Sequence, residues 1–278
     1  MKTITMRFPG GRPKALTLSY DDGVEQDIRL MSIMDAHGIK GTFNLNSGLL
    51  KSEETSYPAG KTHRQLTVAQ ARKVYAHAGH EVAVHGVTHP SLGQLPLPAA
   101  LQEVLEDRRR LEDMFGTVVR GMAYPYGTYN DALIEGLRAV GIAYARTTAC
   151  REDFAIPDDW LRLKATCHHC HPRLTELTDR FLNGDQRGNP WLFYLWGHSY
   201  EFEDNDNWAV IERFCETVGG REDVWYATNL EIYDYVEAYR RLQFGADGRL
   251  VYNPSAVSVW VNADGHVFEV KAGETCDV

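Results

Sequence analysis

The sequence predicts an α/β fold in which parallel strands form a (β/α) barrel and a small antiparallel β appendage follows. Short apolar strands alternate with amphipathic helices along most of the chain. The length of 278 residues is close to the roughly 250 residues that one such barrel uses. After about residue 244 the helical pattern gives way to short alternating runs. We therefore expect the barrel over residues 1–243 and the appendage over residues 244–278.

The first strand–helix unit shows the repeating pattern most plainly. Residues 15–20 are apolar enough for a buried strand, and Ile28, Met31 and Met34 fall on one face of a helix over about 25–37. Gly38 stands where a helix ends.

The same unit recurs along the chain. Further strands are expected at 41–46, 81–84, 118–124, 142–146 and 191–196, and further helices at 68–78, 98–114, 130–140, 208–218 and 230–242. Thr67 is a good N-cap for the helix at 68–78. In the last part of the chain, Asp247-Gly248 and Asp264-Gly265 are typical of tight turns between antiparallel strands.

Composition and charge exclude several classes of protein. Hydrophobic residues make up 44% and charged residues 24%, as in ordinary globular proteins. The 29 Lys+Arg and 38 Asp+Glu residues give a net charge of −9, so we expect neither nucleic-acid nor membrane partners. Five cysteines in a long chain are not a disulfide framework, and residues 1–13 lack the apolar run of a signal peptide. We expect a cytoplasmic protein, and an oligomer is compatible with the sequence.

Unusual polar residues follow the predicted strands at the point where each strand ends. They are Asp21-Asp22-Gly23, then His85 and His89, then Tyr124-Pro125-Tyr126-Gly127, and finally His198. The carboxyl ends of barrel strands meet on one face, where active sites of such folds lie. These residues are therefore expected to converge on one site.

The pair His85 and His89 indicates a metal site when it is combined with the acidic pair. Residues four apart project from the same side of a helical turn. Two neutral imidazoles and one carboxylate suit a divalent transition metal with positions left open for water and substrate. Taken alone, the histidines could be surface or capping residues, and Asp22 could be an N-cap.

Four segments carry a resemblance to a known family. Ser19-Tyr20-Asp21-Asp22-Gly23 resembles the first motif of the polysaccharide deacetylases, the carbohydrate esterases with a NodB homology domain. His85-Gly86-Val87-Thr88-His89 resembles the second motif, Tyr124-Pro125-Tyr126-Gly127 the third and Leu195-Trp196-Gly197-His198 the fifth. The similarity covers about residues 15–240, with the motifs in the family's order.

The resemblance implies a distorted (β/α)7–8 barrel and a metal-dependent hydrolase that removes acetyl from an N-acetylated sugar. By this resemblance Asp22, His85 and His89 would hold a divalent ion, with Zn preferred and Co, Ni, Mn or Fe as alternatives. Asp21 would be the general base and His198 the general acid. The backbone N–H of Tyr126, in the turn with Tyr124 and Pro125, would stabilise the oxyanion.

The chain departs from the family pattern at three places. The third motif usually carries Arg where this chain has Ala123, and Arg120 and Arg146 are the candidates to replace it. The fourth motif is matched only by Asp159-Trp160. In the second motif, Gly86 stands where Ser or Thr is commoner.

For several other candidate site residues, a purely structural role is expected. The string Cys167-His168-His169-Cys170-His171 lacks the second pair of a zinc ribbon and is expected to be a plain loop, with a metal or substrate role as alternatives. Aromatic residues near the expected mouth, including Trp196, would suit a sugar but are more often core. Glu201 is expected in a solvated acidic loop. His63, His77 and His80 have no partner motif and are expected to be surface or hydrogen-bonded core residues.

The sequence therefore predicts a hydrolase of non-peptide carbon–nitrogen bonds that acts on an N-acetylated sugar or a short glycan. One alternative is the same barrel hydrolysing a small cyclic amide, imide or ureide, because relatives with such activities lose motif residues as this chain does at Ala123. A second alternative is a noncatalytic carbohydrate-binding barrel. The presence of both a base and an acid argues against it.

Overall fold

A single parallel sheet forms the centre of the protein, which is described here by a computed structural model covering residues 3–76 and 79–278. The strand order is β7-β6-β5-β4-β3-β2-β9-β8, and β10 also pairs with β2. The strands are β2 (Lys14–Asp21), β3 (Gly41–Leu45), β4 (Glu81–Val84), β5 (Gly121–Ala123), β6 (Tyr144–Cys150), β7 (Leu163–Ala165), β8 (Cys167–His168), β9 (Trp191–Gly197) and β10 (Val224–Tyr226).

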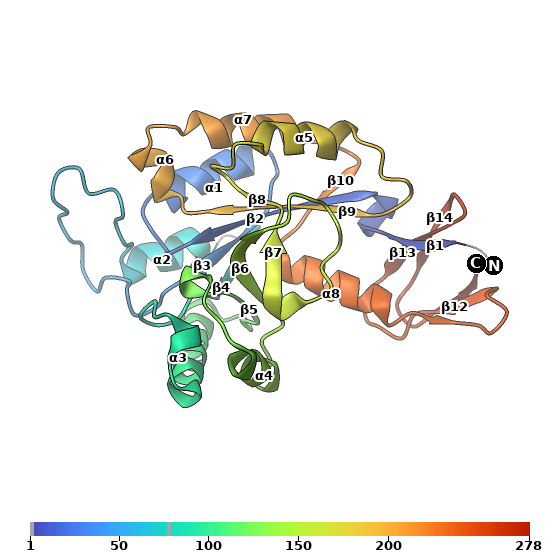
Figure 1. Cartoon of the computed structure of the whole chain (residues 1–278), viewed down its shortest axis with the longest axis horizontal. Coiled ribbons are helices and arrows are strands. Elements are labelled where there is room, and N and C mark those ends of the chain that lie inside the picture. Colours follow the sequence, from blue (N-terminus) through green and yellow to red (C-terminus); the bar gives the residue numbers. More distant parts are fainter. Residues whose placement is uncertain (1–2, 77–78) are drawn as a thin grey trace.

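Helices surround this sheet, as the alternating sequence pattern predicts. In Figure 1, α1, α5 and α7 lie together above the sheet, while α3, α4 and α8 lie on the opposite side. The helices are α1 (Asp27–Ala36), α2 (Val68–Tyr75), α3 (Leu97–Phe115), α4 (Asp131–Ala139), α5 (Leu174–Asn183), α6 (Tyr200–Asp204), α7 (Ala209–Val218) and α8 (Asn229–Arg240).

The two ends of the strand order come from one short stretch of chain. Only Thr166 separates β7, which pairs with β6, from β8, which pairs with β9. The backbone N–H of Thr166 donates to the carbonyl of Tyr194 on β9 at 2.8 Å. The sheet is thus curled into a distorted barrel whose strand ladder stays open. The predicted α/β barrel is confirmed in this form.

Strand β2 shows why the sheet is stable in this position. Every residue of Lys14–Asp21 is buried, as expected for a strand covered on both faces. Its apolar side chains Leu16, Leu18 and Tyr20 join the main core, which also contains Leu30 and Met34 of α1. This rigid centre places Asp21, its last residue, at the edge of the core.

Some elements differ from the sequence-based expectation. The strand expected at 118–124 is only Gly121–Ala123, because Val118 is 67% exposed and lies outside the sheet. Helix α5 and strands β7, β8 and β10 were not anticipated, since these strands have only two or three residues and show no readable alternation. The expected end of the helix at 68–78 falls partly on residues outside the described ranges.

The last part of the chain forms the antiparallel appendage, at the opposite end of the molecule from α2 and α6 (Figure 1). It contains two three-stranded sheets, β1-β13-β14 and β11-β12-β15. The strands are β1 (Ile4–Arg7), β11 (Gln243–Phe244), β12 (Leu250–Tyr252), β13 (Val259–Ala263), β14 (His266–Val270) and β15 (Thr275–Asp277). The first of these strands comes from the beginning of the described chain and pairs with β13.

No helix within residues 3–76 and 79–278 combines the length and the apolar character that crossing a bilayer requires.

Candidate active site

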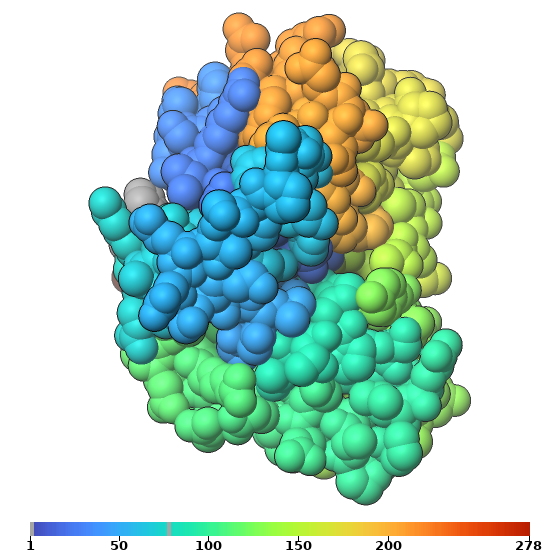
Figure 2. All heavy atoms as spheres, turned by 90° about the vertical axis from the view of Figure 1, so that its left-hand side faces the viewer, coloured from blue at the N-terminus to red at the C-terminus, as the bar shows by residue number. Residues whose placement is uncertain are grey.

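The polar residues at the carboxyl ends of the strands meet on one face of the barrel. Figure 2 looks at this face, and a recess opens at its centre. The light-blue, teal, green and orange segments surround the recess, and dark-blue atoms of the N-terminal part are visible at its floor (Figure 2). The convergence expected from the sequence therefore occurs in the structure.

Asp22, His85 and His89 form a group that we call the donor triad. Their ligand atoms all lie within 4.8 Å of one another. The Oδ1 atom of Asp22 is 3.6 Å from Nε2 of His85 and 3.7 Å from Nε2 of His89. Burial lowers the pKa of His89, and the charge of the nearby His85 lowers it further by a smaller amount. This imidazole is therefore neutral near pH 7, the form that can bind a cation.

Two members of the donor triad stand on unusual backbone. Asp22 has a φ of 84° and His89 a φ of 57°, in the left-handed region that side chains rarely adopt. Such conformations cost about 1–3 kcal/mol each and are concentrated at functional sites. Gly86 between the histidines has a φ of 78°, which explains why glycine replaces the Ser or Thr of the family motif here.

The ring of His85 is held from behind. Its Nδ1 lies 2.9 Å from the carbonyl oxygen of Ala123, so the ring directs Nε2 toward Asp22. The carboxylate of Asp107 on α3 accepts hydrogen bonds from the backbone N–H groups of His85 and Ser47, at 3.0 and 2.8 Å. Burial raises the pKa of Asp107 to about 7. No motif in the sequence marks Asp107, because its partners come from two distant loops.

Asp21 lies beside the donor triad and is held by two other residues. Arg146 donates to its Oδ2, and Asn44 on β3 donates to its Oδ1 at 2.8 Å. Burial raises the pKa of Asp21, but the charges of Arg146, His85 and His198 outweigh this, and the net pKa is lowered. Asp21 is therefore a carboxylate at neutral pH, with a fixed orientation.

Arg146 occupies the place of the arginine that the third motif lacks. It lies on β6, where it is paired in register with Ala123 of β5, so the guanidinium reaches the same level from the neighbouring strand. Arg146 is 1% exposed, and its guanidinium lies 4.3 Å from the centre of the Trp196 ring. The other candidate, Arg120, instead pairs with Asp234 on α8 at 3.1 Å and does not contact Asp21.

His198 follows β9 and faces Asp21 on one side and Glu201 on the other. Its Nε2 is 3.8 Å from Asp21 Oδ2, and its Nδ1 is 3.3 Å from Glu201 Oε1. Burial lowers the pKa of His198, but the carboxylates of Glu201, Asp21 and Asp22 outweigh it and raise the net pKa. Glu201 is thus not a residue of a merely solvated loop, and the expectation that it would be one is wrong.

The nearest match to the fourth motif has another role. Asp159 accepts from the backbone N–H of Leu161 at 3.1 Å, and the Trp160 indole donates to Glu237 at 3.0 Å. Neither residue contacts His198 in the described structure. The carboxylate that faces His198 belongs to Glu201 instead.

The turn after β5 places Tyr124, Pro125 and Tyr126 beside the donor triad. Tyr126 has a φ of 55° and is 65% exposed, and its ring centre lies 4.5 Å from that of His89. Tyr124 is buried and donates its hydroxyl to the carbonyl of Leu161 at 2.9 Å. Tyr126 therefore borders the recess, whereas Tyr124 anchors the turn.

His63 was not assigned to the site from the sequence. The structure brings its Nε2 to 3.3 Å from Oδ2 of Asp22, and its ring packs on Tyr200 with centres 4.6 Å apart. A long loop between β3 and α2 delivers it, and no pattern in that loop predicts the contact. His80 lies 3.0 Å from Asp35 as a hydrogen-bonded histidine, and His77 lies outside the described residues.

The donor triad fits a divalent cation by its chemistry. Two imidazoles and a carboxylate are the donor set of three-ligand sites that leave positions open, and the triad atoms are already close together. Asp21 and His198 adjoin the triad without belonging to it, so they stay free for proton transfer.

Comparison with known proteins gives one family match. The family model described as polysaccharide deacetylase matches residues 9–145, which contain the donor triad and Asp21. No curated protein sequence matches the chain.

Two solved structures share the fold, and a third is similar over about half of its length. A Mycobacterium smegmatis protein described as a polysaccharide deacetylase is 18% identical, with a TM-score of 0.60 over 86% of this chain and 96% of that chain. A mutant of a Bacillus anthracis CE4 family pseudoenzyme, with restored enzymatic activity, is 17% identical. Its TM-score is 0.51 over 83% of this chain and 70% of that chain. A Streptococcus pyogenes deacetylase is 22% identical with a TM-score of 0.42. The aligned region covers 48% of this chain and 55% of that chain.

The family match covers β2 to β5, the turn after β5 and α4, and the similar folds extend over most of the remaining chain. Residues 9–145, about half of the chain, thus match the polysaccharide deacetylase family, and the fold is that of solved structures described as such deacetylases.

Proposed function

We propose that this protein is a divalent-metal-dependent hydrolase that removes the acetyl group from an N-acetylated sugar or a short glycan. One observation carries the proposal: a carboxylate and an imidazole that can transfer protons lie directly beside the donor triad. Asp21 Oδ2 is 3.8 Å from both His85 Nε2 and His198 Nε2. A pseudoenzyme with this fold is known, so the proposal rests on these side chains more than on the fold.

The donor triad would hold the cation through Asp22 Oδ1 and the Nε2 atoms of His85 and His89. When bound, a divalent cation at such a site supplies Lewis acidity, which polarises the amide carbonyl and makes water more acidic.

The chain's own residues would carry the protons. Asp21, ionised and oriented by Arg146 and Asn44, accepts a proton from the attacking water. His198, whose raised pKa keeps it protonated further toward neutral pH, donates a proton to the departing nitrogen. The amide bond breaks, and acetate and a free amine result.

The turn at Tyr126 would stabilise the developing oxyanion through its backbone N–H, which costs no reorganisation because the turn is fixed. Tyr126 is also the exposed aromatic ring beside the donor triad, and such a ring suits the apolar face of a sugar.

The test combines elemental analysis with an acetate-release screen. N-acetylated monosaccharides and short N-acetylated glycans are screened beside small imides and ureides. We expect a bound transition metal and acetate from an N-acetylated sugar. Ring opening of an imide or ureide without acetate release would replace the proposed substrate. Sugar binding without turnover of any amide would contradict the hydrolase itself.

A further inference from the structure

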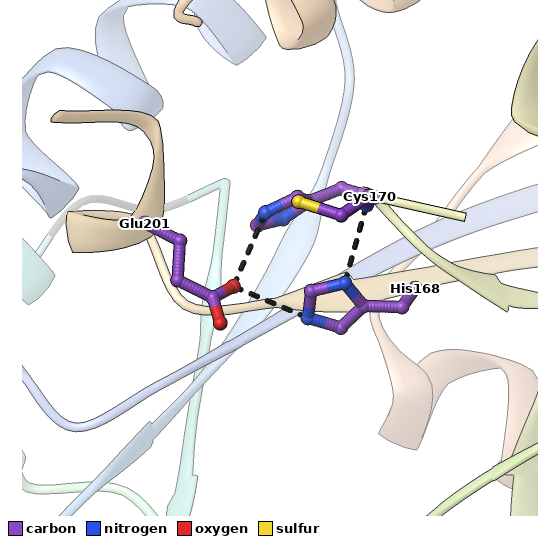
Figure 3. Close-up of side chains that lie close together, drawn as sticks. His168, Cys170 and Glu201 are labelled. Atoms are coloured by element: carbon purple, nitrogen blue, oxygen red, sulfur yellow. Dashed lines mark hydrogen bonds and ion pairs between the residues drawn. The ribbon is translucent and has the colours of Figure 1, made fainter. Parts of the chain in front are cut away.

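A second group of metal-binding residue types lies outside the donor triad. It contains His168, the last residue of β8, the following His169 and Cys170, and Glu201 on α6, and their ligand atoms lie within 4.8 Å of one another. Figure 3 shows His168 and Cys170 facing the carboxylate of Glu201 across a small gap. We call this group the loop cluster. It shares no residue with the donor triad.

His169 is the least expected member of the loop cluster. It is 1% exposed, and its Nδ1 has no hydrogen-bond partner within the described structure, while its Nε2 faces only Glu201 Oε2, at 3.2 Å. Leaving a buried polar group unpaired costs about 1–3 kcal/mol. A buried imidazole with one nitrogen unpaired and the other directed at a carboxylate points to a cation held between the two side chains.

The ring of His169 is also fixed in place. It stacks on Phe202 with ring centres 4.1 Å apart and on Tyr20 at 5.8 Å. A Cβ atom on Gly197 would lie only 2.0 Å from His169 Nδ1, so the ring fills the space that a side chain at this position would need. The nitrogens of this residue thus have set directions before any ligand arrives.

The spacing of the donor atoms matches that of a coordination shell. His169 Nε2 is 3.2 Å from Glu201 Oε2. In a tetrahedral zinc site with bonds of about 2.0–2.1 Å, neighbouring nitrogen and oxygen ligands are roughly 3.3 Å apart. Both atoms can therefore bind the same ion without rearrangement.

His168 has a different role from its neighbour. Its Nδ1 accepts a hydrogen bond from the backbone N–H of Cys170 at 3.1 Å, so the neutral ring carries its proton on Nε2. That Nε2 faces Glu201 Oε2 at 3.2 Å. His168 consequently orients the carboxylate, as residues behind metal ligands commonly do, and leaves three donors.

We propose that His169 Nε2, Cys170 Sγ and Glu201 Oε2 form a second cation site, with a fourth position open to water. A thiolate, an imidazole and a carboxylate in a four-coordinate arrangement favour Zn²⁺, and Co²⁺ can replace it. Cys170 is exposed, so a cation can reach the site from solvent.

This site would act on the neighbouring histidine through a shared carboxylate. Glu201 Oε2 faces the loop cluster and also accepts from the backbone N–H of His198 at 3.3 Å, while Oε1 lies 3.3 Å from Nδ1 of His198. A cation bound to Glu201 fixes that carboxylate and with it the ring of His198. Only this consequence rests on the proposed function, because the site itself depends on the loop cluster alone.

Elemental analysis of the purified protein and three variants tests the proposal. We expect two metal equivalents in the parent, one in Cys170→Ser, one in His85→Ala and none in the double variant. Two equivalents in Cys170→Ser, or none in His85→Ala, would overturn the second site. A single equivalent that only Cys170→Ser removes would support the loop cluster and contradict the proposed catalytic metal.

Cobalt provides a second measurement that does not use activity. The Co²⁺-loaded protein should show an intense near-ultraviolet thiolate-to-Co²⁺ absorption band, which Cys170→Ser abolishes and Cys150→Ser retains. Cys150 is an exposed cysteine outside the loop cluster and makes a matched control. His168→Gln should keep the band and weaken Co²⁺ affinity by about 10–100-fold. A band that survives Cys170→Ser would overturn the proposal.

Discussion

The donor triad and the loop cluster lie on two sides of His198 and differ in the groups around them. The donor triad combines two imidazoles and a carboxylate with a free carboxylate, Asp21, at 3.8 Å. The loop cluster contains a thiol and no free base, and its inner imidazole is buried between aromatic rings. A hydrolytic centre needs a proton acceptor beside its open positions, whereas a structural centre does not. We therefore propose the hydrolytic chemistry at the donor triad, because the free carboxylate Asp21 adjoins its donor atoms.

The largest effect is expected from His85→Ala, which removes one ligand of the donor triad. Activity should fall to the uncatalysed background and one metal equivalent should disappear, because the remaining two donors are too few for tight binding. Acetate release and elemental analysis measure the two effects. His266→Ala, on exposed β14 of the appendage, is the matched control and should change neither. Full activity in His85→Ala would remove this residue from the site.

Asp21→Asn separates the proton acceptor from the cation. The variant should lose at least ~100-fold in kcat, the usual size of a general-base contribution, while it keeps its metal. Asp22→Asn, one residue further on, should lose the metal as well. Parental kcat in Asp21→Asn would show that another group is the base.

Glu201→Gln tests the link between the two clusters. Glu201 raises the pKa of His198, so removing its charge lowers that pKa, and the acid is deprotonated at lower pH. The basic limb of the kcat–pH profile should therefore move to lower pH, with a loss of about 10–100-fold at the optimum. If the kcat–pH profile keeps its shape, whatever the loss in kcat, then Glu201 is not a positioning residue for His198.

The smallest effect on activity is expected from Asp27→Asn, which acts on stability. Asp27 accepts hydrogen bonds from Ser199 and Tyr75 at 2.5 Å each, and burial raises its pKa to about 7. Its folded pKa exceeds the unfolded value of about 3.9, so the stabilisation is complete below pH ~4 and is lost as pH rises through about 7.

The parent should thus lose stability between pH 4 and 7, by up to about 4 kcal/mol from this group. Asp27→Asn cannot ionise and should flatten the decrease in Tm over that range, although Asp107, with a pKa of about 7, leaves part of it. Thermal unfolding followed at several pH values measures the slope. An unchanged slope would mean that Asp27 is ionised in the folded protein.

Much of the fold could be predicted because local pattern and tertiary position agree in it. The strands around Leu18, Phe43 and Val84 carry apolar runs, and the polar residues that follow them mark where each strand ends. Parallel strands bring those ends together, so the meeting of Asp21, Asp22, His85, His89 and His198 follows from topology.

The remaining site residues could not be predicted because they act across strands or loops. Arg146 replaces the missing arginine through its register with Ala123, and strand register is not visible in the linear sequence. His63 arrives from a long loop, and Glu201 follows His198 by only three residues, in a stretch that looks like ordinary solvated acid. Their roles depend on distances that only the folded chain sets.

The short stretch from Leu163 to His168 has a consequence for solubility. It supplies the strands at both ends of the order, and these strands have only three and two residues. Long, straight outer strands offer a row of unpaired backbone groups on which another chain can add and start aggregation. Because one short segment forms both edge strands, each edge has few unpaired backbone groups with which another chain could pair.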